Sequence, residues 1–200
     1  MITIIHGDST DESREHFFQI KTTFQNLLSL GGQNITEEDL MNFFSSGNLF
    51  YEEKNLAIEN LLSKKKADKN LDQLIAILNE HEKKSNIIMW EEKEISSKYL
   101  KLFPKAVVKT FNHPKILFSF LESLKPGNGK LLLESLHELL KSSAQEIVVF
   151  MIIRQIRLLL VIIDKSSKFQ IEEVKKLAPW QKQRLLRQAS FFSEDYLKKI

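Results

Sequence analysis

The sequence lacks cysteine, and it lacks a strong excess of charge of either sign. Without cysteine there can be no disulfide framework, no thiol nucleophile and no thiolate metal site. The formal net charge is +3, which permits an anionic partner without requiring one. The 200 residues are 42% hydrophobic and 28% charged. That composition is ordinary for a soluble globular protein, and the length suits one large or two small domains.

Targeting and membrane signals are also missing. No basic stretch followed by a small-residue cleavage site occurs near the N-terminus. The most apolar run, residues 147–163, carries Arg154 and Arg157 near its middle. Each arginine would cost about 2.5–3.5 kcal/mol at the centre of a bilayer. We therefore expect a buried bundle helix with both arginines on one face, no membrane partner, and a cytoplasmic protein.

The sequence also lacks a complete phosphate-binding loop, although it opens where one would stand. An apolar strand pattern, Ile2–Ile5, runs to Gly7 and then into a helical pattern. A working loop reads G-x-x-x-x-G-K-[ST]. After Gly7 the chain reads DSTDESRE, with no second glycine, no lysine and four acidic residues that would repel a phosphate. The similar GNGK at 127–130 is followed by Leu131, which favours a helix–helix turn. We expect no nucleotide hydrolysis and no catalytic residue.

Metal-ligand patterns are equally scarce. The five histidines are scattered along the chain and show no His-x-x-x-His or other paired-ligand spacing. They stand at positions 6, 16, 81, 113 and 137. We therefore expect neither a metal site nor a cofactor.

The hydrophobic pattern of the first half predicts strands that alternate with helices. Strands are predicted at 2–5, 55–60, 86–90 and 106–111. Helices are predicted at 11–28, 36–44, 69–81 and 95–103, and the second of these begins with a capping-box-like TEED. This alternation indicates an α/β domain with a parallel sheet.

Strand signals end at His113-Pro114, and the remaining pattern is helical. Helices are predicted at 115–124, 130–141, 144–165, 171–177 and 180–189, with another beginning at Ser193. We place the domain boundary here: residues 1–113 form the α/β domain and residues 114–200 an all-α domain.

Two short segments suggest binding. Leu49, Phe50 and Tyr51 stand in the polar segment SSGNLFYEEKNLAIEN, residues 45–60. Three large apolar residues in such a segment are either tucked into the domain or offered to the hydrophobic pocket of a partner. The second segment is Lys64, Lys65 and Lys66, expected in a loop after the second strand. It is either a solvated turn or a contact to a nucleic-acid phosphate backbone.

The order of several segments resembles the delta subunit of bacterial DNA polymerase III, the clamp-loader delta family. The segment at 45–60 is similar to the family's small–Leu-Phe–charged–strand segment. FNHPKILFSFLESLKPGNGKLLLESLHELL resembles its first collar helices, and IIRQIRLLL its Arg-Gln-x-Arg-Leu-Leu helix. APWQKQRLLRQASFFSEDYL is similar to a later helix that runs into Phe-Ser and another helix.

This resemblance implies a degenerate AAA+-like domain (P-loop NTPase-like) followed by a helical collar-like domain. It implies a subunit that does not hydrolyse ATP but binds the ring-shaped sliding clamp and holds one interface open during DNA replication. Leu49 and Phe50, with Tyr51 beside them, would enter the pocket on the clamp. The collar would join other clamp-loader subunits, and Arg154 and Arg157 would be structural or face such a subunit. Contact with DNA, through Lys64–Lys66, is a further implied role.

Two features depart from the family pattern. The family has a small helical lid domain between the α/β domain and the collar, whereas here the fourth strand runs through FNHP almost directly into collar-like helices. The family's collar also continues beyond the point at which this sequence stops, Ile200. We expect a short form, either cut or naturally reduced, that lacks the lid and the last part of the collar.

Two other functions are compatible with the residues. One is a helical protein–protein interaction adaptor with an α/β cap and no link to replication. The other is an enzyme such as a nucleotide-dependent transferase, against which the missing phosphate-loop lysine argues. Clamp binding that depends on Leu49 and Phe50 would separate the clamp-loader subunit from the adaptor, and nucleotide binding would favour the enzyme.

Overall fold

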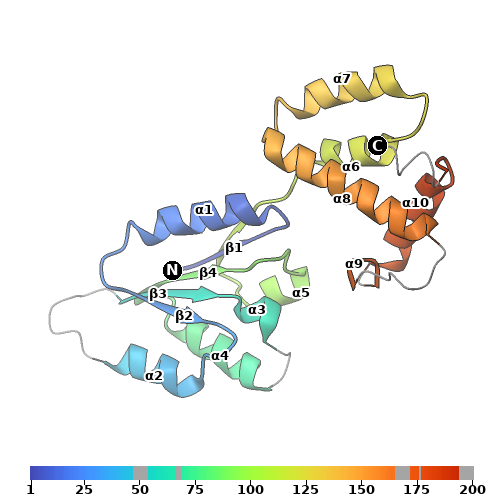
Figure 1. Ribbon diagram of the computed structural model, residues 1–200. Coiled ribbons are helices and arrows are strands. Elements are labelled where there is room, and N and C mark those ends of the chain that lie inside the picture. Colours follow the sequence, from blue (N-terminus) through green and yellow to red (C-terminus); the bar gives the residue numbers. More distant parts are fainter. Residues whose placement is uncertain (47–53, 66–68, 165–171, 176, 194–200) are drawn as a thin grey trace. The chain divides into compact units, whose positions relative to one another are not determined.

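The computed structural model describes residues 1–46, 54–65, 69–164, 172–175 and 177–193 (Figure 1). The chain divides into two compact units, Met1–His113 and Pro114–Ile200. The first unit contains a parallel sheet with helices, and in the second the described residues form helices joined by turns and loops, with no strand. The expected fold class, α/β followed by all-α, is confirmed.

Five parallel strands form the sheet of the first unit. In the order β2-β3-β4-β1-β5 they are Leu27–Gly31, Lys54–Glu59, Ser85–Trp90, Ile2–His6 and Val107–Thr110. In the register of the sheet, Ile4 lies opposite Met89 of β4 and Val108 of β5. The three central strands are covered on both faces, which explains why their sequences are nearly continuous apolar runs.

Helices cover both faces of this sheet (Figure 1). Helix α1 (Thr10–Lys21) covers one face, where Phe17 packs against Ile5, Ala57, Ile88 and Trp90. Helices α2 (Glu37–Ser45) and α4 (Lys69–Glu80) cover the other. There Leu40, Leu71, Leu74 and Leu78 pack against Ile4, Leu56, Ile58 and Met89. Alternate strand residues thus supply two separate layers of core.

The predicted helix at 11–28 was wrong at its C-terminal end. Helix α1 ends at Lys21, a turn follows in which Asn26 has a φ of 53°, and β2 begins at Leu27. Leu27 and Leu28 continue the helical spacing of the apolar residues before them, so periodicity alone did not reveal the change. Because β2 is an edge strand paired only with β3, most of it is exposed or half-buried and carries no marked apolar alternation.

The remaining differences concern short elements. The predicted helix at 95–103 contracts to α5 (Ser97–Leu100), with turns after it. A four-residue helix that the sequence analysis did not predict, α3 (Leu61–Lys64), follows β3 directly. The basic run at 64–66 therefore begins at the end of a helical turn rather than within a loop. The predicted capping box at the start of α2 is confirmed.

The second unit consists of α6 (Lys115–Ser123), α7 (Gly129–Leu139), α8 (Gln145–Ile163), α9 (Glu172–Lys175) and α10 (Pro179–Ala189). One apolar cluster joins α6, α7 and the first half of α8. Another joins the second half of α8 to α9 and α10. The helix predicted to begin at Ser193 falls mainly outside the described residues.

Helix α8 is buried along one side only, although its sequence predicts a buried helix. Met151, Leu158 and Leu159 lie in the core, whereas Phe150 and Ile153 are 63% and 61% exposed. Among the described residues, no helix has the length and apolar character needed to cross a membrane. Phe150 and Ile153 form an exposed apolar patch on this helix.

Candidate functional site

One side chain joins the two residues that flank the segment containing Leu49, Phe50 and Tyr51. The segment at 47–53 connects the end of α2 to the start of β3. The Nζ of Lys54, the first residue of β3, donates to the carbonyl oxygens of Phe43 (2.9 Å), Phe44 (2.6 Å) and Ser46 (2.6 Å). The last carbonyls of a helix have no partner within it, and a cation beside them also favours the helix dipole. Lys54 thus joins the two ends of the segment.

Helix α2, from which the chain enters the segment at 47–53, is fixed to the rest of the unit by several contacts. Thr36 and Asp39 form a reciprocal capping box at its start, in which the Thr36 hydroxyl and amide hold the pKa of Asp39 below its usual range. Leu40 is fully buried. The Phe44 ring stacks on His81, with ring centroids 4.1 Å apart and planes at 13°. These contacts position the residue from which the segment departs.

Leu49, Phe50 and Tyr51 themselves lie outside the described residues. The structure therefore describes the two ends between which they are connected, and their expected contact with a partner stays a prediction.

The position of the phosphate loop, between β1 and α1, is occupied by contacts within the chain. The amides of Asp8 and Ser9 donate to Asn112 Oδ1 (3.2 Å) and the Phe111 carbonyl (3.0 Å). The Asp8 carboxylate accepts from the amide of His113 at 2.7 Å. Gly7 has a φ of +145°, and a Cβ there would lie 1.8 Å from the Phe111 carbonyl oxygen. Amides that would face a phosphate in a working loop are thus bonded to the segment that follows β5.

Buried polar groups organise the carboxyl edge of the sheet. Glu91, just after β4, is fully buried and accepts from the amides of Leu62 and Ser63, both at 2.8 Å. Burial raises the pKa of Glu91, and these bonds oppose the shift. His6, at the end of β1, accepts from the Ile95 amide at Nδ1 and lies 3.2 Å from Thr110 Oγ1 at Nε2. Both side chains thus anchor turns to the sheet.

The basic run at 64–66 is engaged within the unit as far as it is described. The Nζ of Lys64 pairs with Glu92 at 3.3 Å, and the Nζ of Lys65 donates to the carbonyl of Ile35 at 2.6 Å. Lys66 lies outside the described residues. The expected contact of these lysines with a DNA backbone stays a prediction, and the intramolecular partner of Lys65 counts against it.

Arg154 and Arg157 meet at one carboxylate. On α8 they lie one turn apart, and both pair with Glu173 of α9. Burial alone would raise the pKa of Glu173, but the two guanidinium groups outweigh it and lower the pKa. Arg157 remains about half exposed. The arrangement ties α9 to α8, and a contact of these arginines with another subunit stays a prediction.

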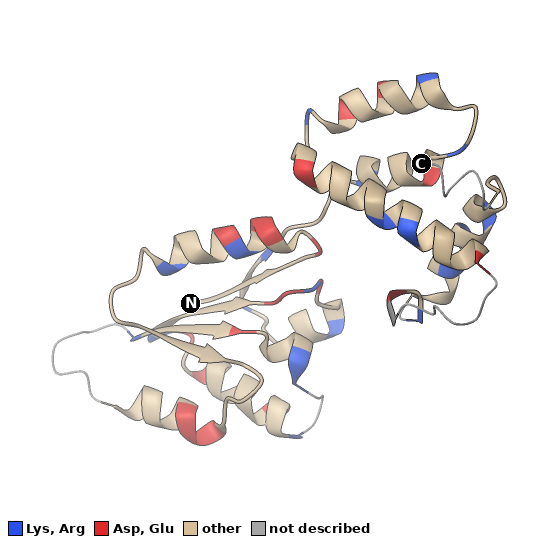
Figure 2. Cartoon of the chain, viewed as in Figure 1, with Lys and Arg blue, Asp and Glu red and all other residues tan. Residues whose placement is uncertain are grey.

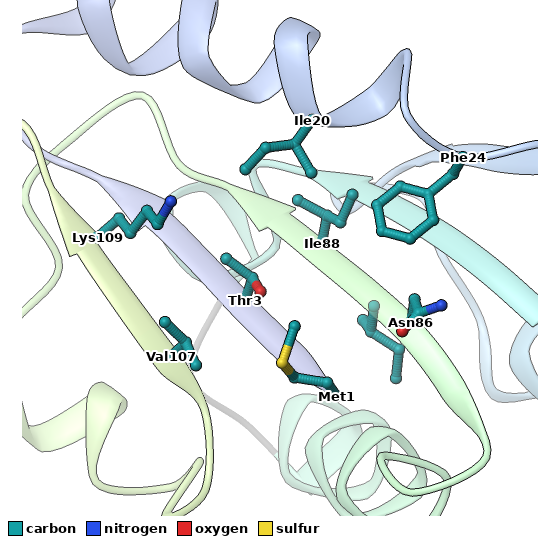
Figure 3. Close-up of a pocket in the computed structure, with 9 residues that line it drawn as sticks. Met1, Thr3, Ile20, Phe24, Asn86, Ile88, Val107 and Lys109 are labelled. Carbon is teal, nitrogen blue, oxygen red and sulfur yellow. The ribbon is translucent and has the colours of Figure 1, made fainter.

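In the part of the chain that the structure describes, two cavities lie beside the sheet. One of about 170 Å³ is lined mainly by apolar groups, among them Ile20, Phe24 and Val107, with Lys109 at its margin (Figure 3). It is smaller than the roughly 300–1,000 Å³ of typical small-molecule sites. The other, about 400 Å³, is polar and lies at the carboxyl ends of β2 and β3, beside Asn34 and Asn60. Within the described ranges, no three histidine or acidic side chains gather as metal ligands do.

Some of the residues that organise these regions carry no sequence signal. Lys54 is one of 29 lysines and arginines, and only its position after the end of α2 reveals its role. Gln188 of α10 is another: it is buried and its Nε2 donates to the carbonyls of Leu121 and Leu124, but no pattern in the sequence around it predicts this.

Comparison with solved structures supports the fold seen here. The chain is similar to the DNA clamp loader delta protein (YqeN) of Bacillus subtilis, with a TM-score of 0.55 and 13% identity over 99% of this chain and 86% of that one. For AMPPCP-bound DnaA from Aquifex aeolicus the TM-score is 0.37 and the identity 12%, over 92% of this chain and 69% of that one. For a DNA polymerase III gamma subunit-related protein from Thermotoga maritima the TM-score is 0.38 and the identity 15%, over 94% of this chain and 72% of that one.

At 13% identity, the first similarity is one of fold. The resemblance to the clamp-loader delta family that the sequence suggests is confirmed at that level, and the two lower scores support no further statement. Neither a protein-family model nor a curated protein sequence matches the chain.

Proposed function

We propose that the chain is a non-catalytic clamp-loader delta-like subunit that binds the sliding clamp and helps to open it during DNA replication. The observation that carries this proposal is the fold-level similarity to a clamp loader delta protein over 99% of the chain. By resemblance, the family's Leu-Phe pair corresponds to Leu49 and Phe50 of this chain. The bonds of Lys54 are consistent with this role, because they join the two residues that flank the segment, Ser46 and Lys54.

The chemistry of such a contact is burial of apolar surface. Leu49 and Phe50 would each contribute about 1.5–3 kcal/mol on entering a hydrophobic pocket, and Tyr51 would lie beside them. Burial alone does not open a ring. A subunit that binds the open clamp more tightly than the closed one shifts the clamp toward opening by that difference in affinity.

The absence of enzymatic activity belongs to the same proposal. The amides of Asp8 and Ser9 are already bonded within the chain, and the sequence has no phosphate-loop lysine after Gly7. Neither feature is expected in a nucleotide hydrolase. Other clamp-loader subunits are the proposed partners of the second unit, whose α8 exposes Phe150 and Ile153.

The test is surface-plasmon binding of the full chain to the sliding clamp of its own organism, with the wild type beside Leu49→Ala/Phe50→Ala. Met41→Ala is the matched control, because Met41 is a 50%-exposed apolar residue on α2 outside the segment. We expect binding that the double variant abolishes and the control preserves, with the same circular dichroism for all three proteins. A folded wild type that does not bind the clamp would favour the helical-adaptor alternative.

A further inference from the structure

Helix α8 exposes a line of four residues along one side. Glu146, Phe150, Ile153 and Arg157 follow each other at spacings of four, three and four residues. Side chains at such spacings lie on the same side of a helix. Phe150 and Ile153 are 63% and 61% exposed, and Glu146 and Arg157 are exposed as well. We call these four residues the α8 seam; at 1.5 Å per residue it extends about 16 Å.

The seam is apolar at its centre and oppositely charged at its two ends. Glu146 is the only acidic residue of α8, and Arg154 and Arg157 are its only basic ones. Figure 2 shows this separation, with the acidic colour at the start of the helix and the basic colour further along. Val149, which is 50% exposed, widens the apolar centre beside Phe150. Each copy of the chain thus carries both halves of an attractive charge contact.

The opposite side of α8 holds the seam in place. Apolar side chains there pack into two cores, one with α6 and α7 and the other with α9 and α10. The Nε2 of Gln155 donates to Oε1 of Gln188 in α10 at 2.6 Å. Arg157 pairs with Glu173 of α9 and keeps about half of its side chain exposed. The seam residues therefore keep their order on the surface without a partner.

The two charged ends match a second copy of the same helix that runs in the opposite direction. In an antiparallel pair with its two-fold axis midway between Phe150 and Ile153, Phe150 of each copy meets Ile153 of the other. The same axis places Glu146 of each copy against Arg157 of the other, so both charge contacts are attractive. A parallel pair would instead place each of these charges beside its own kind. Antiparallel pairing is also the isologous arrangement of a closed dimer.

We propose that the α8 seam is a self-association surface, at which two copies of this chain form an antiparallel pair of α8 helices. Contact removes the apolar centre from water, and the flanking charges fix the direction and the register. One helix pair buries less than the roughly 1,200 Å² at which standard stable interfaces begin. We therefore expect a weak dimer, with a dissociation constant on the order of 10–100 μM.

This inference goes beyond the proposed function, because no residue of the seam belongs to the segment at 47–53. A loader subunit that binds the same face of α8 would compete with the second copy.

The experiment is sedimentation equilibrium of the full chain, at concentrations from well below to well above the expected dissociation constant. The average mass should rise from that of one chain to that of two and then stop, because an isologous contact closes. Added salt should weaken the dimer, since its charge pairs lie at the rim. Phe150→Gln should raise the dissociation constant at least about tenfold. Leu131→Gln is the matched control, because Leu131 of α7 is 61% exposed and lies outside the seam.

Charge reversal tests the register. Glu146→Arg and Arg157→Glu should each weaken association at least about fivefold, because each places like charges opposite one another twice in the dimer. Glu146→Arg/Arg157→Glu should restore association, and so should an equimolar mixture of the two single variants. Arg154 remains as a partner of Glu173 in these variants, and circular dichroism checks that each of them is folded.

The absence of cysteine from the chain allows the direction of pairing to be tested by crosslinking. Under mild oxidation with copper phenanthroline, Glu146→Cys/Arg157→Cys should form a covalent dimer, because the two positions meet across the axis. Glu146→Cys alone should form far less, since the two copies of position 146 lie at opposite ends of the pair.

Three results would overturn the proposal. They are a folded wild type that stays monomeric at every concentration, a dimer that Phe150→Gln leaves intact, and a dimer whose affinity both single charge reversals leave unchanged. The first result would leave this face of α8 to a different subunit. Because the clamp is absent from the measurement, each result is independent of whether Leu49 and Phe50 bind it.

Discussion

The ammonium of Lys54 lies 2.6 Å from the carbonyl oxygen of Ser46, so the first residue of β3 is bonded to the residue that directly follows α2. The same Nζ reaches the carbonyls of Phe43 and Phe44. Lys54→Met keeps much of the stem of the side chain but removes every one of these bonds. We expect a loss of about 1–2 kcal/mol in the free energy of unfolding. We also expect several-fold weaker clamp binding, because the segment at 47–53 would no longer be held at both ends.

The measurement pairs urea unfolding with surface-plasmon binding. Lys93→Met is the matched control, because Lys93 is 70% exposed and pairs only loosely, at 3.9 Å, with its neighbour Glu92. Equal clamp affinities for Lys54→Met and wild type would show that the bonds of Lys54 do not prepare the segment for binding.

Nucleotide binding should be undetectable. In the β1–α1 turn, the amides of Asp8 and Ser9 donate to Asn112 and Phe111, and the Asp8 carboxylate would meet any phosphate with like charge. A thermal-shift series with millimolar Mg·ATP should leave the midpoint of unfolding unchanged, since only a ligand that binds the folded state raises it. A midpoint that climbs and saturates with ATP would contradict this and support the enzyme alternative.

The central strands were predicted correctly from the sequence because buried strands give a strong apolar signal. The strands around Ile4, Leu56 and Met89 are covered on both faces, and their sequences are nearly continuous apolar runs. The edge strand β2 was missed for the opposite reason. It is paired on one side only, so its sequence must satisfy fewer contacts, and Leu27 and Leu28 fitted a continued helix equally well.

The candidate site was predictable only in part. The Leu49-Phe50 pair stands out as apolar residues in a polar segment, and the role proposed for it comes from resemblance to a family. The hydrogen bonds of Lys54 and Gln188 could not be predicted from a single sequence. No sequence pattern indicates which side-chain donor reaches which carbonyl at the end of a helix. The basic residues show the same limit, since Lys65 looked available for a phosphate yet donates to the carbonyl of Ile35.

Acid should destabilise the first unit through His6. Burial lowers the pKa of His6 below its ordinary value of 6.5, although Glu94 opposes the shift. Neutral Nδ1 accepts from the Ile95 amide, and a protonated ring would lose that bond. The unfolded state therefore binds the proton more tightly, so this stability is present above 6.5 and is lost as the pH falls through the lowered pKa.

Urea unfolding at about pH 7.5 and pH 5.5 tests this, because that interval spans the titration of histidine. His6→Gln should flatten the dependence. The pKa of His16 is also lowered, by burial and by the charge of Lys109. His16→Gln is therefore the comparison, and it should retain the pH dependence of stability that His6 causes. Identical pH dependence in wild type and His6→Gln would mean that another group is responsible.

Gln188 should hold the second unit together. Its Nε2 satisfies the carbonyls of Leu121 and Leu124, and its Oε1 accepts from Gln155 of α8 at 2.6 Å. Gln188→Leu keeps a similar volume but strands two carbonyls and an amide in a buried place. An unsatisfied buried group costs about 1–3 kcal/mol, so we expect at least about 2 kcal/mol less stability.

The two tryptophans allow this loss to be assigned to one unit. Trp90 lies in the core of the first unit and Trp180 on α10 of the second. Gln188→Leu should lower the urea midpoint of the fluorescence change of Trp180 and leave that of Trp90 unchanged. Gln155→Leu/Gln188→Leu should lower the free energy of unfolding by less than the sum of the two single variants, because the two buried amides share a hydrogen bond. If the urea midpoints reported by Trp90 and Trp180 fall together, the two units unfold as one, and Gln188 stabilises the whole chain rather than the position of α10 alone.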